Sequence, residues 1–324
     1  MAPILLIKRW GAGFWSDVEH VVGQLVAADI LARIPVVHWG ISGPYADGKI
    51  DTFGLYFQPL SDLSVDDLTG SVWPECWTAA NITDDLPFAA TGHINPAYGY
   101  YEFSMEKARV PIDQRRVKGM LGLPHDIVVS MCHESPQIIA QSAPPTSIYH
   151  QANADQVRRI VMRDRIKLRR SVADEIERFW QQNLQDHPVL AIHLRGSSKV
   201  VENINIHREN DAALPLAAQW LAGDAQRKVF LISDSEAYHR KWSDIFGASL
   251  VTQSCRRTDS EQISNFLLPD TDGWSNGLEI LIDTYCAAKC ERFIGNSSSN
   301  VSNFVAAIGE FSGDAIFFTN GPDR

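Results

Sequence analysis

Residues 189–199 have the sequence VLAIHLRGSSK, in which an apolar run leads directly into a basic Gly/Ser loop. The apolar run predicts a buried strand over Val189–His193. Ligands of open α/β sheets bind at the carboxyl ends of strands, so we expect a site where this strand ends. Arg195 and Lys199 suit a diphosphate, because a guanidinium binds oxygens as a fork and an ammonium adds a compact charge. A loop salt bridge is the structural alternative.

Strand and helix signals alternate on both sides of this stretch, which predicts an α/β fold with parallel sheets covered by helices. Before it, a strand over Pro3–Ile7, a glycine turn, a helix to about Arg33 that Ser16 can cap, and a strand over Pro35–Trp39 form one β-loop-α-β unit. Residues 45–145 are irregular, with a short strand candidate at Ile127–Val129. The elements expected after residue 170 are helices over Ser171–Gln182, Ala212–Leu221, Glu236–Phe246, Asn276–Lys289 and Ser299–Ile308, and strands over Val229–Ile232, Ser249–Thr252 and Arg292–Ile294.

Length and composition indicate a soluble globular protein of two domains. The chain has 324 residues, 45% hydrophobic and 21% charged, with 29 Lys+Arg, 39 Asp+Glu and a formal net charge of −10. This acidic balance argues against nucleic-acid binding. The exception is Arg158–Arg170, with seven Lys/Arg among thirteen residues, which we predict to be an amphipathic connector with a solvated basic face.

The five cysteines are an odd number, are widely spaced and form no CxxC pair, so we expect reduced thiols and no metal site. Asp270-Thr271-Asp272 has the DxD spacing of a metal-binding motif, but its flanking Pro269 and Gly273 favour a turn. The N-terminal segment has only about four apolar residues before Lys8, far fewer than a signal peptide or the ~20 residues of a membrane span. We therefore expect a cytoplasmic protein without a membrane span.

A second candidate site is the glycine turn Gly11-Ala12-Gly13-Phe14 between the first strand and helix. Free backbone N–H groups and the helix dipole make such a turn a natural anion site. Ser16 stands where a dinucleotide fingerprint has its third glycine, and the next strand ends without a ribose-binding carboxylate, so NAD is not expected. A phosphate-facing loop and a plain tight turn both remain open.

A third candidate is the stretch FIGNSSSNV, residues 293–301, where a strand leaves through small hydroxyl residues into a helix. Ser298, Ser299 and Asn300 could form an anion cradle at the helix N-terminus, and a serine cap with serine filler is the compatible structural alternative. Asp283 lies sixteen residues before Ser299 within an apolar helix. Its carboxylate could pair with the N1–H and N2–H donors of a guanine base.

Three stretches together resemble a known family. VLAIHLRGSSK (189–199), VFLISDS (229–235) and LIDTYCAAKCERFIGNSSSN (281–300) resemble, in order and spacing, the fucosyltransferases that include the nodulation-factor and core α1,6 enzymes. The protein O-fucosyltransferases are more distantly similar. The likeness covers roughly residues 160–310, and the N-terminal half only through its glycine turn.

The resemblance implies a GT-B-like architecture of two facing Rossmann-like domains. Residues 1–165 would form the acceptor-side domain, and residues 166–324 would form the domain that binds the GDP-sugar. It also implies GDP-fucose as donor, inversion at the anomeric carbon and no essential metal. The expected partners are therefore the GDP-sugar and an acceptor that is a glycan, a peptide or a small molecule.

Roles for individual residues follow from the same resemblance. Arg195 would bind the β-phosphate and stabilise the departing GDP, with Lys199 beside it. His193 and Asp283 would line the guanine side. The remaining members of the predicted donor set are Asp234, Ser298, Ser299, Asn300 and the loop Gly11, Ala12, Gly13 and Phe14.

The acceptor base stays open, because the chain departs from the family pattern here. The core enzymes have an Asp where this chain has Ser198, and their downstream acid lies one place after Glu202. Glu202 is our first choice because it follows the Arg–Lys loop, and Asp17 and His38 are alternatives.

The sequence therefore predicts a metal-independent, inverting transferase that moves fucose from GDP-fucose to a hydroxyl group. One alternative is a related GT-B enzyme that uses another nucleotide sugar, such as a different GDP-hexose. The other is a catalytically silent protein that binds nucleotide or glycan.

Overall fold

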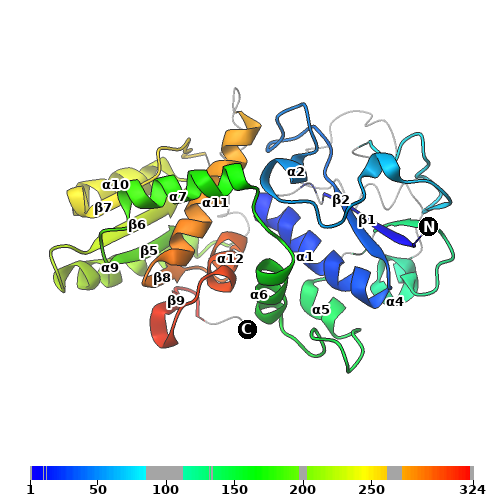
Figure 1. Cartoon of the computed structure of the whole chain (residues 1–324). Helices are drawn as coiled ribbons and strands as arrows, with labels where there is room; N and C mark the ends of the chain where they lie inside the picture. The colour runs from blue at the N-terminus through cyan, green and yellow to red at the C-terminus, as the bar shows by residue number, and fades with distance from the viewer. Residues whose placement is uncertain are drawn as a thin grey trace. The chain divides into compact units, whose positions relative to one another are not determined.

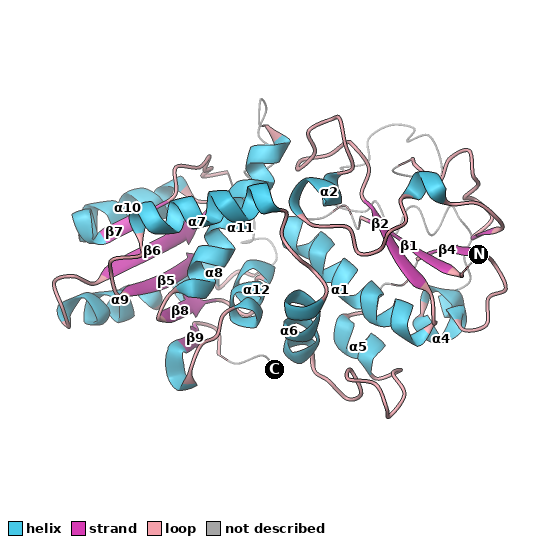
Figure 2. Cartoon of the chain, in the orientation of Figure 1, coloured by secondary structure: helices cyan, strands magenta, loops and turns pink. Residues whose placement is uncertain are grey.

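The computed structural model describes residues 2–9, 11, 13–84, 112–130, 132, 134–196, 203–260 and 272–321. The chain divides into two compact units, Met1–Arg169 and Arg170–Arg324. Each unit has its own parallel sheet with helices packed around it (Figures 1 and 2). The predicted α/β class is confirmed.

The sheet of the first unit has the order β2-β1-β4-β3, and all neighbouring strands run parallel. Every residue of β1 is buried, as expected for the apolar run ILLI at the centre of a parallel sheet. The strands are β1 (Ile4–Lys8), β2 (Ile34–His38), β3 (Val72–Trp73) and β4 (Ile127–Val129). The helices are α1 (Phe14–Ile30), α2 (Thr52–Tyr56), α4 (Val117–Met120), α5 (Pro136–Ala140) and α6 (Ala154–Asp164), with 3₁₀ turns at Val65–Asp67 and Ile112–Arg115.

The start of α1 corrects one expectation. The helix begins at Phe14 with Gly13 as its N-cap residue, and no side chain caps it, so the prediction that Ser16 is the cap is wrong. The backbone N–H of Ser16 instead donates to the Gly13 carbonyl at 2.8 Å within the first turn. The extended backbone of Gly13 (φ −69°, ψ 157°) lets the helix start three residues earlier than the serine suggests.

The basic segment 158–170 is not one connector with a solvated face. It is divided between α6, which ends at Asp164, and the next helix, which begins at Arg170. Arg158 is only 7% exposed, and its guanidinium donates to both oxygens of Glu19 at 2.8 and 2.9 Å and to Asp155 at 2.6 Å. The prediction of a solvated face is therefore wrong for Arg158, because α1 brings Glu19 against α6.

The sheet of the second unit has the order β7-β6-β5-β8-β9, again with parallel neighbours. The chain fills one side of β5 first and then returns to fill the other, which places the topological switch point between β5 and β8. The strands are β5 (Val189–Leu194), β6 (Lys228–Ser233), β7 (Leu250–Thr252), β8 (Arg292–Gly295) and β9 (Ile316–Phe318).

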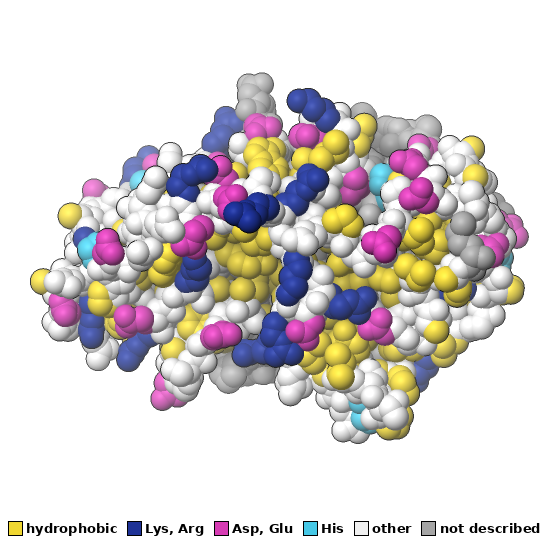
Figure 3. All heavy atoms as spheres, viewed as in Figure 1, with side chains coloured by type: hydrophobic (Ala, Val, Ile, Leu, Met, Phe, Trp, Pro, Cys, Tyr) yellow, Lys and Arg dark blue, Asp and Glu magenta, His cyan; other side chains and the backbone are white. Residues whose placement is uncertain are grey.

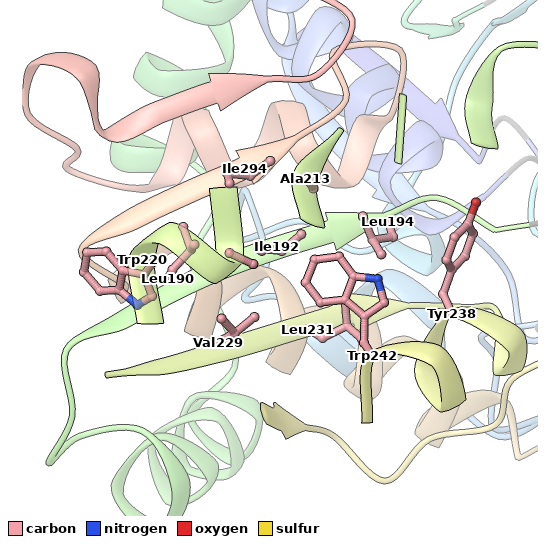
Figure 4. Packing of buried hydrophobic residues seen from close by; sticks show 11 residues of the cluster. Leu190, Ile192, Leu194, Ala213, Trp220, Val229, Leu231, Tyr238, Trp242 and Ile294 are labelled. Carbon is pink, nitrogen blue, oxygen red and sulfur yellow. The ribbon is translucent and has the colours of Figure 1, made fainter. Parts of the chain in front are cut away.

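Helices of the second unit pack on both faces of its sheet (Figure 2). They are α7 (Arg170–Asn183), α8 (Ile206–Asp211), α9 (Ala213–Ala222), α10 (Glu236–Phe246), α11 (Gly273–Lys289) and α12 (Asn300–Ile308), with 3₁₀ turns at Gly247–Ser249 and Gly313–Ala315. On one face, alternate residues of β5 and β6 point into a single core with α9 and α10 (Figure 4). This core contains Leu190, Ile192, Leu194, Ala213, Ala217, Trp220, Val229, Leu231, Tyr238, Trp242 and Ile294.

Basic and acidic side chains lie interspersed over the surface seen in Figure 3. No helix in the described part of the chain is both long and apolar enough to cross a membrane.

Candidate functional site

The candidate site is at the switch point of the second sheet, where β5 and β8 end. β5 leads into Arg195 and Gly196, and β8 leads into the turn Asn296–Ser299 ahead of α12. The neighbouring strand β6 leads into Asp234. The carboxyl ends of parallel strands meet at one edge, so the sheet order gathers these segments where an α/β protein binds its ligand.

Arg195 is held in place through both its side chain and its backbone. Its Nη1 donates to Asp234 Oδ2, and Asn210 Nδ2 donates to its carbonyl at 2.8 Å. The side chain of Arg195 is 20% exposed, so the guanidinium is partly buried but reachable. This is a preorganised cation at the mouth of the sheet.

Gly196 has the close approach that only glycine allows. Its N–H donates to Asp234 Oδ1 at 2.6 Å. A Cβ atom at this position would overlap that same oxygen and stand 3.0 Å from Asp234 Cγ. The predicted donor residue Asp234 thus contacts the Arg195 loop through both carboxylate oxygens.

His193 is buried beneath this loop and bonded to the second segment of the site. Its Nδ1 shares a hydrogen bond of 2.8 Å with Ser302 Oγ of α12, and the same hydroxyl accepts from Asn296 N–H at 3.1 Å. Burial, with a further contribution from the Arg195 charge, lowers the pKa of His193 to about 4. His193 is therefore a neutral imidazole at neutral pH that connects β5 to α12.

The turn before α12 is organised by the fully buried Asn296. Its Oδ1 accepts from Ser298 N–H at 3.0 Å and from Ser298 Oγ at 2.6 Å. The helix begins at Asn300 with Ser299 as N-cap residue, yet no side chain makes the capping hydrogen bond. A helix N-terminus without a side-chain cap is suited to an anion.

Asp283 lies in a second group of polar side chains on the same unit. Gln253 Nε2 donates to Asp283 Oδ1 at 3.3 Å and to the Glu279 carbonyl at 3.1 Å. Burial raises the pKa of the half-buried Asp283 carboxyl to about 8; the Arg257 charge opposes this shift and the Glu279 charge adds to it. Asp283 is thus largely protonated at neutral pH in the ligand-free protein.

The Asp283 group is connected to the Arg195 group through the chain after β7. Thr258 N–H donates to the Asp234 carbonyl at 2.9 Å, and Arg257 Nη2 donates to the Gln253 carbonyl at 2.7 Å. Burial raises the pKa of the Cys255 thiol, so this side chain stays a thiol rather than a thiolate at neutral pH.

In the first unit, two backbone donors of the glycine turn form hydrogen bonds within the protein. Gly11 N–H donates to Asp17 Oδ1 at 2.8 Å, and Phe14 N–H donates to the Tyr45 hydroxyl at 3.0 Å. Gly11 has φ +84°, a conformation that requires glycine here. The carboxyl of Asp17 is buried and orders the turn; a phosphate-facing role for Gly11–Phe14 stays a prediction.

His38, one of the candidate bases, has a hydrogen-bond acceptor at each ring nitrogen. Nε2 lies 2.9 Å from the Thr83 carbonyl, and Nδ1 lies 3.1 Å from Asp51 Oδ1. The Thr83 carbonyl and the Asp51 carboxylate can only accept hydrogen bonds, so each ring nitrogen of His38 lies against a protein oxygen rather than in an open position. Ala12, Ser198, Lys199 and Glu202 lie outside the described residues.

Several residues that organise the site were not expected from the sequence. Asn210, Gln253 and Ser302 lie outside the predicted motifs, because each acts through a partner elsewhere in the chain. Asn296 lies within the stretch 293–301 but was not among the residues predicted to bind the donor. Asp272 of the DxD stretch is the N-cap of α11, where its Oδ2 accepts from Ser275 N–H at 3.1 Å; Asp270 and Thr271 lie outside the described residues. Within the described ranges, no three His, Cys, Asp or Glu side chains are grouped as metal ligands.

The second unit also has a cavity of about 370 Å³ that is separate from the candidate site. It is lined by residues at the beginning of β5 and β8, Leu190 and Arg292, and by Trp220 at the end of α9. It therefore lies at the amino-terminal edge of the sheet, opposite the candidate site.

Comparison with known proteins gives structural neighbours only. No protein-family model and no curated sequence matches the chain. The fucosyltransferase NodZ from Bradyrhizobium is similar over 95% of this chain and 94% of its own, with 16% identity and a TM-score of 0.58. NodZ α1,6-fucosyltransferase soaked with GDP-fucose has 17% identity and a TM-score of 0.56, covering 95% and 93%. POFUT1 in complex with GDP-fucose has 13% identity over 98% of both chains and a TM-score of 0.54.

These likenesses extend over nearly the whole chain, including the N-terminal half where the sequence resembles the family only at one turn. They confirm that the chain has the fold of these fucosyltransferases, with two parallel α/β units of the Rossmann type.

Proposed function

We propose that the protein is a glycosyltransferase that moves fucose from GDP-fucose to a hydroxyl group of a glycan, peptide or small-molecule acceptor. The observation that carries the proposal is Arg195, fixed by Asp234 and Asn210 at the switch point beside the uncapped N-terminus of α12. The shared fold supports it, because the neighbours include fucosyltransferases solved with GDP-fucose.

The chemistry requires stabilisation of the leaving group. Breaking the bond between the anomeric carbon and the β-phosphate leaves an oxocarbenium-like sugar and places negative charge on the diphosphate. A cation and N–H donors that are already oriented stabilise this charge without reorganising in the transition state. We assign the cation to Arg195 with Lys199, and the remaining phosphate contacts to Ser298, Ser299 and Asn300 at the start of α12. The N–H of Ser299 donates to the Asn296 carbonyl at 3.0 Å, so Ser299 would contact a phosphate through its hydroxyl.

Guanine selectivity is assigned to Asp283, with His193 on the same side of the donor. The Asp283 carboxylate has two acceptor oxygens for the N1–H and N2–H of guanine, a pattern that adenine and uracil do not present. Gln253 Nε2 donates to Asp283 Oδ1, so we assign Asp283 Oδ2 and the second lone pair of Oδ1 to the guanine base.

Transfer is proposed to invert the anomeric centre and to need no metal ion, as the family resemblance implies. The acceptor hydroxyl then attacks from the face opposite GDP and loses its proton to a base, for which Glu202 remains the first candidate. Asp17 and His38 are weaker candidates, since Asp17 is buried and each ring nitrogen of His38 lies against a protein oxygen. Residues 1–165 would bind the acceptor and residues 166–324 the donor.

We also propose that the protein works in the cytoplasm. Its five cysteines, Cys76, Cys132, Cys255, Cys286 and Cys290, are all free thiols, the usual state in a reducing compartment.

The test is calorimetry with GDP, UDP and ADP, followed by a donor-hydrolysis assay with GDP-fucose and other GDP-hexoses. GDP should bind most tightly, and GDP-fucose should be hydrolysed fastest. Turnover should persist in EDTA. A protein without preference for GDP would rule out the guanine assignment. Preferred hydrolysis of another GDP-hexose would assign a different donor, and GDP binding without turnover on any donor would identify a silent binding protein.

Arg195→Ala should lower turnover roughly 10²–10³-fold, as expected when a preorganised charge is removed from a leaving group. Arg195→Lys should retain only part of the wild-type turnover, because an ammonium group cannot bind two phosphate oxygens side by side as a guanidinium does. Arg240→Ala is the matched control: Arg240 belongs to the same unit and forms an exposed ion pair with Asp259 at 2.9 Å. Equal turnover in Arg195→Ala and Arg240→Ala would remove Arg195 from the mechanism.

A further inference from the structure

Glu209 on α8 bonds two asparagines that belong to different segments of the candidate site. Its Oε2 accepts from Asn203 Nδ2 at 2.8 Å and from Asn296 Nδ2 at 2.7 Å. Asn203 comes nine residues after the end of β5, whereas Asn296 follows β8 directly and is fully buried. One carboxylate oxygen of a half-buried side chain thus connects both sides of the switch point.

The bond to Asn296 determines how that side chain is used. An amide has its donors on one atom and its acceptor on another, so the donation to Glu209 fixes which side of Asn296 faces the turn. The carbonyl Oδ1 then accepts from the backbone and the hydroxyl of Ser298. Without Glu209, the Asn296 amide would lose the partner that orients it, and the Ser298 turn would lose its anchor.

Asn210, the residue after Glu209 on α8, bonds the backbone of Arg195 just after β5. Asn210 Nδ2 donates to the Arg195 carbonyl, so α8 contacts Arg195 through Asn210 and Asn203 through Glu209. Asn210 is 1% exposed, and α8 is therefore rigidly seated where it makes these bonds. The helix is a common support for the residues that we assign to the diphosphate.

We infer that Glu209 is a positioning residue that, with Asn210 beside it on α8, couples Asn203 and Arg195 to the Ser298 turn, so that Arg195 and this turn bind the diphosphate as one preformed site. This inference rests on the proposed function for its ligand, a nucleoside diphosphate. Glu209 itself contacts no substrate. Both asparagine side chains donate charge-assisted hydrogen bonds to the same oxygen, Glu209 Oε2. The position of this oxygen therefore fixes Asn203 and Asn296 relative to each other.

The expected effect is on donor affinity and turnover, with little loss of fold. Glu209→Ala should weaken GDP binding roughly 10- to 100-fold, the range expected when buried donors lose a charged acceptor. Glu209→Gln keeps an acceptor oxygen of the same reach, although it lacks the charge, and should recover most of the affinity. Asp211→Ala on the same helix, which breaks only an exposed ion pair with Lys241, should bind GDP like the wild type.

Coupling is measured with a double-mutant cycle. Asn203→Ala and Asn296→Ala should each weaken GDP binding in the wild-type background. In the Glu209→Ala background the Asn203→Ala change should have almost no further effect, because its partner is already absent. Additive effects would show that Glu209 does not couple the two segments.

Amide hydrogen exchange without nucleotide separates this inference from the proposed function. Glu209→Ala should speed exchange both at residues 203–205 and at residues 296–299, whereas Asp211→Ala should speed neither. If the wild type binds no GDP but both segments respond, the proposed function fails and the coupling stands. If the wild type binds GDP and Glu209→Ala behaves like Asp211→Ala in affinity and exchange, the coupling is refuted.

Discussion

GDP affinity should depend on pH through Asp283. The guanine N1–H and N2–H groups need acceptor oxygens, so the binding-competent form of Asp283 is the carboxylate. Burial raises the pKa of this carboxyl to about 8. At neutral pH the protein must therefore lose a proton from Asp283 before or as it binds GDP, and affinity should rise with pH.

The size of the effect follows from the ionised fraction. With a pKa of about 8, roughly 1% of Asp283 is ionised at pH 6, about 10% at pH 7 and about half at pH 8. The dissociation constant of GDP should fall about ninefold from pH 6 to 7 and about fivefold from pH 7 to 8. Because the diphosphate also titrates near pH 6, the quantity to compare is the ratio of the ADP and GDP dissociation constants.

The assay is isothermal titration calorimetry at pH 6, 7 and 8 in buffers of different ionisation enthalpy. At pH 7 the wild type should release about 0.9 proton more for GDP than for ADP. Asp283→Asn should abolish this difference and the pH slope of the ratio. Glu279→Gln should shift the slope to lower pH, since the Glu279 charge is one of the causes that raise the Asp283 pKa.

A wild-type ratio that stays constant from pH 6 to 8 would refute the reasoning. So would an unchanged slope in Asp283→Asn, because the proton would then come from another group.

Three further predictions concern stability. The folded-state pKa of Asp283 is raised above its usual 3.8, so its stabilising contribution is complete below pH 3.8 and is lost as pH rises through about 8. The Tm of Asp283→Asn relative to that of the wild type should therefore rise from pH 4 to 9. A Tm difference that calorimetry finds constant over this range would contradict the prediction. Gly196→Ala should displace the Asp234 side chain, lower the free energy of unfolding by about 1–3 kcal/mol and weaken GDP binding. An unchanged free energy of unfolding in urea would contradict this prediction. Arg158→Ala leaves the half-buried Glu19 unpaired and should cost about 3 kcal/mol, of which a second change, Glu19→Gln, should restore part; no recovery in the double variant would show that the ion pair is not the cause.

The elements of the second unit were largely predictable from sequence. The helix predicted over Glu236–Phe246 has those bounds, and β5 differs from its prediction only by including Leu194. These elements have regular apolar periodicity and clear caps, such as Ser235 Oγ accepting from Tyr238 N–H at the start of α10. β9 was missed because its three residues are too short for a periodic signal.

The first unit was less predictable. Its short α2, α4 and α5, and the two-residue β3, lie in a region where Pro, Gly and aromatic residues interrupt any period. The burial of a single side chain, Arg158, was also not predictable from the local sequence. Local sequence places it on a basic stripe, but a carboxylate 139 residues away makes it a buried partner.

The sequence by itself determined the α/β class, the segments that leave the strands as polar loops, and the resemblance from which the donor was proposed. Those properties are local, since alternation, caps and turn residues act within a few positions of the chain. Only the tertiary structure decided which polar groups meet. The order β7-β6-β5-β8-β9 brings His193 to Ser302 and Glu209 to Asn296, pairs that are 109 and 87 residues apart. The state of Asp283 was likewise set by packing, because burial is the largest cause of its raised pKa and the charge of Glu279, four residues earlier, only adds to it.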